Sequence, residues 1–165
     1  MILALGLAGC GGGDKSTADI TKNWSVERLY REAKAELDAG NYKRATGHYE
    51  RLSARFPYGK YAQQAQLEQA YAYFKDNEKA SALATCDRFI KLYPNHENVD
   101  YAYYLKGLIS FNEDRGIVAK FSDQNPSERD PEAMRESFDA LQQLVTRFPD
   151  SKYAPDAIKR MRYLV

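Results

Sequence analysis

The sequence predicts an all-α protein built from repeated helical hairpins, and three observations support this prediction. Apolar residues recur at helical spacing from residue 25 onward. The phrase RFPYGKYAQQA at residues 55–65 returns as RFPDSKYAPDA at residues 147–157, with seven of eleven positions identical. Proline closes successive helical stretches at Pro57, Pro94 and Pro149. A phrase that recurs at corresponding points of a chain indicates a structural unit rather than a catalytic site.

The first hairpin is predicted between residues 25 and 57. Ser25 can cap the first helix, in which leucine and alanine recur every four residues. The turn-prone segment DAGNY at residues 38–42 ends that helix, and a second amphipathic helix continues to Phe56. Pro57 then stops the second helix, because proline lacks an amide proton and restricts the residue before it.

Two further hairpins and the start of a fourth are predicted to follow. The second hairpin lies between Pro57 and Pro94, which are 37 residues apart. The third hairpin runs from Pro94 to Pro149, a distance of 55 residues. The residues by which it exceeds the second hairpin fall in a polar, turn-rich stretch. We interpret this stretch, residues 112–131, as an insertion, with room for a short helix at residues 117–121. The fourth hairpin opens at Tyr153.

These periods and small-residue positions resemble the tetratricopeptide repeat, a helical hairpin of about 34 residues. Small residues stand where the two helices of each hairpin approach most closely, at Ala33, Ala70 and Gly107. Ser137 stands where the third repeat would carry alanine in its second helix. The fold prediction is therefore about three repeats plus the start of a fourth, stacked into a superhelix with a concave groove.

The first helix of each such repeat lines the groove, and this rule gives a set of predicted groove residues rich in aromatic rings. The set is Tyr30, Lys34, Leu37, Leu67, Tyr71, Phe74, Lys75, Tyr101, Tyr104, Leu108 and Phe111. An aromatic groove favours a peptide ligand with apolar or aromatic side chains. The alternative is that several of these rings are core residues between repeats.

The first ten residues, MILALGLAGC, resemble the end of a secretory signal peptide. They are too few to span a bilayer as a helix, which takes about 20 residues. Leu7-Ala8-Gly9-Cys10 matches the lipobox of bacterial lipoproteins, a resemblance that implies covalent lipid on Cys10; a chance match is the alternative. No positive charge precedes the apolar run, so we expect the natural precursor to begin upstream. Residues 11–24 are predicted to be a flexible tether, and residues 25–165 the repeat domain.

Composition and motifs argue against catalysis and nucleic-acid binding. Lys and Arg total 24 and Asp and Glu total 23, so the chain lacks the basic excess of a nucleic-acid binder. His48, predicted on a helix surface, and His96, in a turn, have no second ligand at metal spacing. Cys86 falls on an apolar helix face, where we predict a small buried hydrophobe. We therefore predict a protein that is no enzyme and holds no metal or cofactor, apart from the lipid on Cys10.

A more specific resemblance covers nearly all the chain from Cys10 onward. It is carried by the strings WSVERLYREAK, ARFPYGKYAQQAQLEQAYAYFK, NVDYAYYLKGLISFNED and RDPEAMRESFDALQQLVTRFPDSKYAPDA. These strings closely resemble the outer-membrane assembly lipoprotein family called BamD or ComL. Members of that family carry more repeats, so we expect this chain to be the N-terminal part of a longer repeat domain.

The resemblance implies a scaffold of the β-barrel assembly machine, anchored by lipid at the periplasmic face of the outer membrane. Implied partners are the barrel subunit BamA, lipoproteins such as BamC and BamE, and unfolded outer-membrane proteins whose last strand ends in an aromatic residue. Lys34 and Lys75 would then be candidate partners for the terminal carboxylate. Two alternatives remain open: a purely structural periplasmic adaptor without substrate binding, and a peptidoglycan-associated competence lipoprotein.

Overall fold

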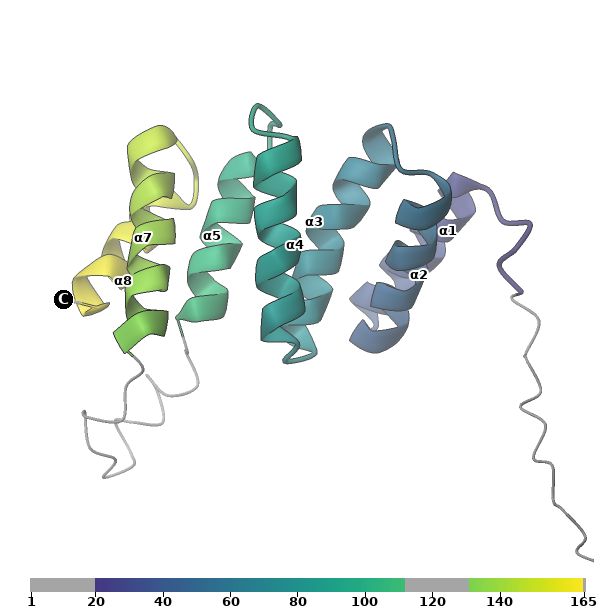
Figure 1. Ribbon diagram of the computed structural model, residues 1–165, viewed down its shortest axis with the longest axis horizontal. Helices are drawn as coiled ribbons and strands as arrows, with labels where there is room; N and C mark the ends of the chain where they lie inside the picture. The colour runs from purple at the N-terminus through teal and green to yellow at the C-terminus, as the bar shows by residue number, and fades with distance from the viewer. Residues whose placement is uncertain (1–19, 112–130, 165) are drawn as a thin grey trace, which may run out of the picture.

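The computed structural model describes residues 20–111 and 131–164, and within them the chain forms seven α-helices and no strand (Figure 1). The helices are α1 (Val26–Asp38), α2 (Tyr42–Arg55), α3 (Lys60–Lys75), α4 (Lys79–Leu92), α5 (Val99–Ser110), α7 (Pro131–Arg147) and α8 (Ala154–Leu164). The all-α prediction is confirmed. The predicted lipobox, most of the predicted tether and all but the last residue of the predicted insertion lie outside the described residues.

The helices form a stack of hairpins arranged in two rows. In Figure 1, α2, α4 and α7 lie toward the viewer, and α1, α3, α5 and α8 form the second row behind them. Each helix packs against the next one in this order, and α1 also contacts α3, as α3 does α5. Three hairpins therefore follow one another, with α8 as the first helix of a fourth, which is the predicted tetratricopeptide-like arrangement.

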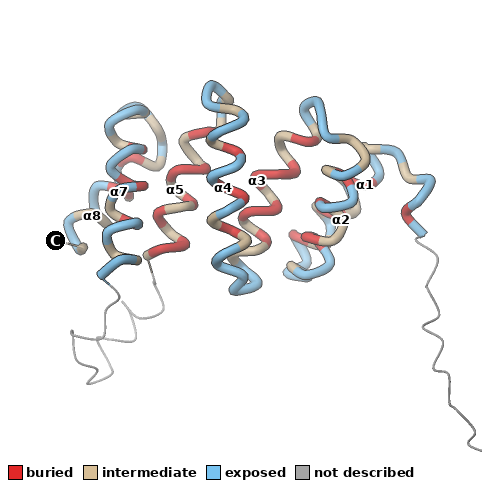
Figure 2. The backbone as a smooth tube through the Cα atoms, in the orientation of Figure 1, coloured by how far each residue is buried: buried red, intermediate tan, exposed pale blue. Residues whose placement is uncertain are grey.

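Buried residues recur along every helix of the stack and are coloured red in Figure 2. Leu29, Tyr49 and Leu52 are completely buried in the first hairpin, and Phe89 is completely buried in the second. Cys86 is also buried as a free thiol, and this burial raises the pKa of the thiol to about 12. The thiol therefore packs as a small hydrophobe, as the sequence predicted. None of the helices in the described part of the chain combines the length and the apolar character needed to cross a bilayer.

Both ends of α1 follow from local sequence. Ser25 Oγ accepts a hydrogen bond from the Arg28 amide at 3.3 Å, which confirms Ser25 as the helix cap. At the other end, Gly40 adopts a positive φ of 77°, a conformation that costs glycine little. The Asn41 amide then donates to the Glu36 carbonyl at 2.8 Å, closing the turn that leads into α2.

The third hairpin is held together at a close approach between α5 and α7. A Cβ atom added to Gly107 would lie 2.4 Å from Leu141 Cδ2, so a larger residue would force Leu141 to shift. Ser137 Oγ, completely buried, donates to the Gly107 carbonyl at 2.9 Å. The serine that departs from the repeat pattern therefore has its hydroxyl satisfied across the same helix contact.

The residues just before α1 are attached to α2 through Arg55. Its Nη1 donates to the Thr21 carbonyl at 2.6 Å, and its Nη2 donates to the Lys22 and Trp24 carbonyls, both at 2.8 Å. Thr21 is only 2% exposed. The last four residues of the predicted tether therefore pack against the domain.

The Trp24 ring continues this attachment onto the α2 surface. It stacks on the His48 ring with centroids 5.8 Å apart, and the Arg28 guanidinium lies 4.3 Å from its centroid. His48 is half-buried, and its buried Nδ1 has no hydrogen-bond partner among the described residues. Burial, helped by the positive charge of Arg51, lowers the pKa of His48, so the imidazole is favoured in its neutral form. His48 therefore lies on the α2 surface, as predicted, and is partly covered there by the Trp24 ring.

Candidate functional site: a tyrosine-lined hollow

An open hollow of about 510 Å³ runs along the second row of helices. Its lining comes from α1, α3 and α5, from the start of α2, and from the segments that precede α5 and α8. The lining residues are Lys34, Leu37, Asp38, Tyr42, Gln64, Leu67, Glu68, Tyr71, Asn98, Tyr101 and Tyr153. The hollow thus draws on all four hairpins.

The hollow brings together five of the predicted groove residues. These are Lys34, Leu37, Leu67, Tyr71 and Tyr101. Leu37 and Leu67 are 8% and 2% exposed, so they contribute mainly to the core beneath the hollow. The alternative that some predicted groove residues are core residues therefore holds for these two.

Other predicted groove residues near the first two hairpins lie beside the hollow. Phe74 is half-buried and packs against the core cluster that contains Cys86. Lys75 is exposed, and its Nζ lies 6.0 Å from the ring centroid of Tyr42, which lines the hollow. Tyr30 does not line the hollow, although its hydroxyl donates to Glu68, which does.

Three of the predicted groove residues, those at and beyond the middle of α5, also lie outside the lining of the hollow. Tyr104 stacks on Tyr153 with ring centroids 4.8 Å apart and is not itself among the residues that line the hollow. Leu108 is half-buried and does not line the hollow. Phe111 meets the Tyr163 ring edge-on at 5.8 Å and carries the Arg160 guanidinium 5.3 Å from its centroid. Phe111 therefore belongs to the contact between the third hairpin and α8.

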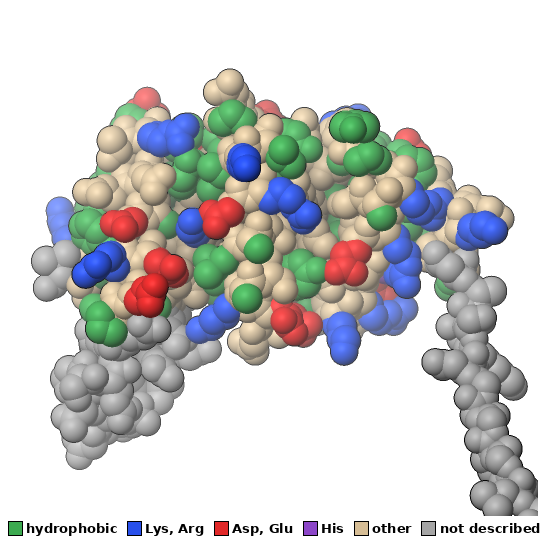
Figure 3. Space-filling view, in the orientation of Figure 1, with side chains coloured by type: hydrophobic (Ala, Val, Ile, Leu, Met, Phe, Trp, Pro, Cys, Tyr) green, Lys and Arg blue, Asp and Glu red, His purple; other side chains and the backbone are tan. Residues whose placement is uncertain are grey.

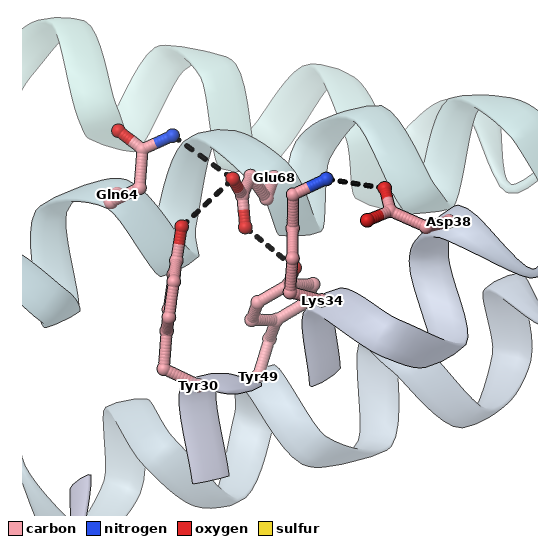
Figure 4. Close-up of polar contacts among 6 residues, drawn as sticks. All are labelled: Tyr30, Lys34, Asp38, Tyr49, Gln64 and Glu68. Carbon is pink, nitrogen blue, oxygen red and sulfur yellow. Dashed lines mark hydrogen bonds and ion pairs between the residues drawn. The ribbon is translucent and has the colours of Figure 1, made fainter. Parts of the chain in front are cut away.

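Glu68 is the polar centre of the hollow, and Figure 4 shows three side chains converging on it. The Tyr30 hydroxyl donates to Oε1 at 2.9 Å, and the Tyr49 hydroxyl donates to Oε2 at 2.6 Å. Gln64 Nε2 adds a third bond to Oε1 at 3.0 Å. The carboxylate thereby joins α1, α2 and α3. Sequence reasoning missed Glu68, although it lies three residues before Tyr71 on the predicted groove face of the same helix.

Both tyrosines that bind Glu68 are held as neutral donors. Burial raises the pKa of Tyr49 far above its usual value of 10.0, and the hydrogen bond to Glu68 raises it further. Burial and then the charge of Glu68 raise the pKa of Tyr30 in the same direction. The proton therefore stays on each phenol throughout the physiological pH range.

Lys34 lies beside this centre, paired with Asp38 one turn along α1 (Figure 4). The hydrogen bond to Asp38 raises the pKa of Lys34, and the negative charge of Glu68 acts in the same sense. Sequence reasoning offered Lys34 as a partner for a ligand carboxylate. The structure shows that the side chain already has an acidic partner within its own helix.

The far wall of the hollow is aromatic. The rings of Tyr101 and Tyr153 lie 5.4 Å apart, and burial raises the pKa of Tyr101, which keeps it neutral. The hydroxyl of Tyr104, which stacks on Tyr153, donates to Asp156 Oδ2 at 2.6 Å and links α5 to α8. This wall offers large, rigid surfaces to a ligand.

The molecule outside the hollow has a different character. On the face formed by α2, α4 and α7, basic and acidic side chains are interspersed with apolar ones (Figure 3). Within residues 20–111 and 131–164, no three His, Cys, Asp or Glu side chains gather in a way that could hold a metal ion. The hollow is therefore the feature of the described chain that the sequence and the geometry both single out.

Comparison with known proteins gives a consistent set of relatives. Residues 22–165 match the family model YfiO, described as outer membrane lipoprotein. The chain is 54% identical, over 99% of its length, to the outer membrane protein assembly factor BamD of Neisseria meningitidis serogroup B. It is 37% identical over 97% of its length to the protein of the same name from Vibrio cholerae. The chain spans 62% and 65% of the lengths of these two relatives.

Proposed function

Because the chain belongs to the YfiO family of outer membrane lipoproteins, we propose that it is a non-enzymatic factor in the assembly of outer-membrane proteins. Membership of this family indicates an association with the outer membrane. The relatives from Neisseria meningitidis and Vibrio cholerae are both named outer membrane protein assembly factors, a non-catalytic role. The chain would act from the periplasmic face, as a scaffold that presents its hollow to unfolded protein.

The tyrosine-lined hollow carries this proposal. Tyr42, Tyr71, Tyr101 and Tyr153 give it apolar surface with polar edges, which suits the alternating side chains of an unfolded barrel strand. The open hollow runs past several hairpins, so an extended segment would contact more than one repeat at once. Lys34 is engaged by Asp38, so we assign the terminal carboxylate of such a segment to exposed Lys75 beside Tyr42.

The partners of the assembly machine complete the proposal. We assign BamA and its companion lipoproteins to surfaces outside the hollow, which leaves the hollow open to substrate. The mixed charge on the face of α2, α4 and α7 is compatible with a protein contact. Photo-crosslinkers placed on this face should capture BamA or a companion lipoprotein in cells, and crosslinks confined to the hollow would contradict this assignment.

Substrate binding is tested by replacing Tyr71 with alanine. Tyr71 lines the hollow and is half-buried, so Tyr71→Ala should weaken binding of a synthetic barrel C-terminal peptide by about fivefold or more. Tyr58→Ala is the matched control, because Tyr58 is 89% exposed and lies outside the hollow. Equal affinities for wild type and Tyr71→Ala, with the helical content unchanged, would favour the purely structural adaptor.

The lipid anchor is a separate element of the proposal. Cys10 would carry the acyl chains, and two or more chains give stable anchoring, at about 0.8 kcal/mol per buried methylene. Cys10→Ser should release the protein from the membrane fraction while its circular dichroism stays the same. Retention of Cys10→Ser in that fraction without partner proteins would contradict a lipid anchor at this residue.

A further inference from the structure

Among the described residues, the hydrogen-bond partners of the Glu68 carboxylate are all neutral. In the described part of the chain, no Lys or Arg nitrogen lies within ion-pair distance of its carboxylate; Tyr30, Tyr49 and Gln64 supply neutral donors. Oε1 accepts two of these three bonds and Oε2 accepts one. A carboxylate offers about four acceptor positions, so Oε2 keeps one for a further donor.

The residues that line the hollow carry a net negative charge. Its lining contains one cation, Lys34, and two carboxylates, Asp38 and Glu68. Lys34 and Asp38 form an ion pair, which leaves the charge of Glu68 in excess. A partly buried carboxylate is screened less than an exposed one, so its field reaches a ligand in the hollow. Charge complementarity therefore favours a positively charged group on the ligand.

The aromatic walls favour the same group. Cations are attracted to the faces of tyrosine rings within about 6 Å of the centroid. Tyr71, Tyr101 and Tyr153 line the hollow together with Glu68. The molecule already uses tyrosine in this way, since the Lys152 ammonium lies 5.0 Å from the Tyr153 ring centroid and the Arg147 guanidinium lies 5.2 Å from that of Tyr103.

We propose that Glu68 selects peptide segments that carry an arginine or lysine side chain, which enters the hollow and binds Oε2 beside the tyrosine walls. This inference rests on the proposed function, because it specifies which unfolded segments the hollow takes. Arginine should bind better than lysine, since its planar guanidinium can donate to the carboxylate while stacking on a ring. The role of Glu68 is therefore distinct from the aromatic contact that Tyr71 would make.

The inference is tested with two peptides of alternating aromatic and polar residues, each with an acetylated N-terminus and a free C-terminal carboxylate. One carries a single central arginine and the other carries citrulline there, which has the same shape without the charge. We expect the unmodified protein to bind the arginine peptide about tenfold more tightly, by isothermal titration. Glu68→Gln should remove this preference, so that both peptides bind the variant with equal affinity, because the glutamine amide carries no charge and only its carbonyl oxygen can accept a hydrogen bond. Asp139→Asn, an exposed change on α7, should keep the preference.

A second variant changes affinity in the opposite direction. Lys34→Gln removes the cation that competes for the hollow and leaves Asp38 unpaired, so the arginine peptide should bind several-fold more tightly. Weaker binding of that peptide to Lys34→Gln would overturn the inference. Equal binding of both peptides to the unmodified protein would also overturn it while leaving the proposed function intact, as would an equal loss for both peptides in Glu68→Gln. Failure of both peptides to bind the unmodified protein would overturn the proposed function as well.

Discussion

At the scale of single residues, the phenol proton of Tyr49 links the stability of the fold to the hydrogen bonds at Glu68 in the hollow. Tyr49 is completely buried, and its hydroxyl donates to the partly buried carboxylate of Glu68. Ionising this phenol would place two negative charges 2.6 Å apart in a poorly solvated site. The fold around the hollow is therefore stable only while the Tyr49 phenol is neutral.

Alkaline titration should expose this dependence. The pKa of Tyr49 is raised in the folded state, so its contribution to stability is fully present below pH 10.0 and is lost as pH rises above that value. Tyr49→Phe should cost about 2 kcal/mol at pH 7 but show a shallower loss of stability above pH 10. Denaturant unfolding followed by circular dichroism from pH 7 to 11 measures both effects. Tyr58→Phe serves as the exposed control, and an alkaline slope unchanged in Tyr49→Phe would contradict the coupling.

Gly107 provides a steric prediction at the same scale. Gly107→Ala should destabilise the protein by about 1–3 kcal/mol, because Leu141 is completely buried and cannot move aside without strain. Gly47→Ala is the matched control: its Cβ would meet only Arg51 Nη1, at an ordinary 3.5 Å. That control should be stabilised by about 0.5–1 kcal/mol through helix propensity. Thermal unfolding compares the two, and changes of the same sign would contradict this account.

At the scale of elements, the C-terminal end of α2 determines where the chain enters the domain. Arg55 is the arginine of the phrase RFP, and it holds three carbonyls of the segment before α1. In the second copy of the phrase, Arg147 instead donates to the Tyr103 hydroxyl. The same residue at the end of two second helices thus makes different contacts, according to which neighbour is available.

Replacing Arg55 should free this segment without unfolding the helices. Arg55→Lys keeps the charge but cannot span three carbonyls with one planar group. Because Trp24 is the single tryptophan, its fluorescence reports on the segment. We expect the fluorescence change to occur at lower denaturant concentration than the loss of helical circular dichroism, with a local cost of about 2 kcal/mol. Coincident transitions in Arg55→Lys would contradict this expectation, and Arg51→Lys is the control on the same helix.

The elements were largely predictable from the sequence, whereas the site was only partly so. Helical periodicity, the cap at Ser25 and the small residue at Gly107 each leave a local pattern, so the hairpins could be predicted in order. Glu68 leaves no such signal, because a carboxylate on a helix face is usually solvated and its tyrosine donors come from other helices. The carbonyls bound by Arg55 are likewise invisible in sequence. Lys34 forms an ion pair with Asp38, and the four-residue spacing in the sequence permits this pair but does not require it.

At the scale of the whole molecule, the joints between hairpins are unevenly bonded. The first joint is crossed by the bonds of Tyr30 and Tyr49 to Glu68, and the Tyr73 hydroxyl adds a bond to Glu50. The joint before α8 is crossed by Tyr104 bound to Asp156 and by Ser151 bound to Asp100. At the middle joint, between α4 and α5, the described residues contribute apolar packing and a single side-chain polar contact, the partly exposed ion pair of Lys106 with Asp87.

Because fewer side-chain polar contacts cross the middle joint than the other two, we expect the stack of hairpins to bend mainly at that joint. Tyr71 and Tyr101 stand on opposite sides of that joint, so flexing would widen or narrow the hollow. Spin labels at Lys43 and Lys91 should therefore give a narrower distance distribution than labels at Lys91 and Asp139, and the reverse order would contradict this view. Bending at this joint would change the curvature of the superhelix, with each hairpin moving as an intact body.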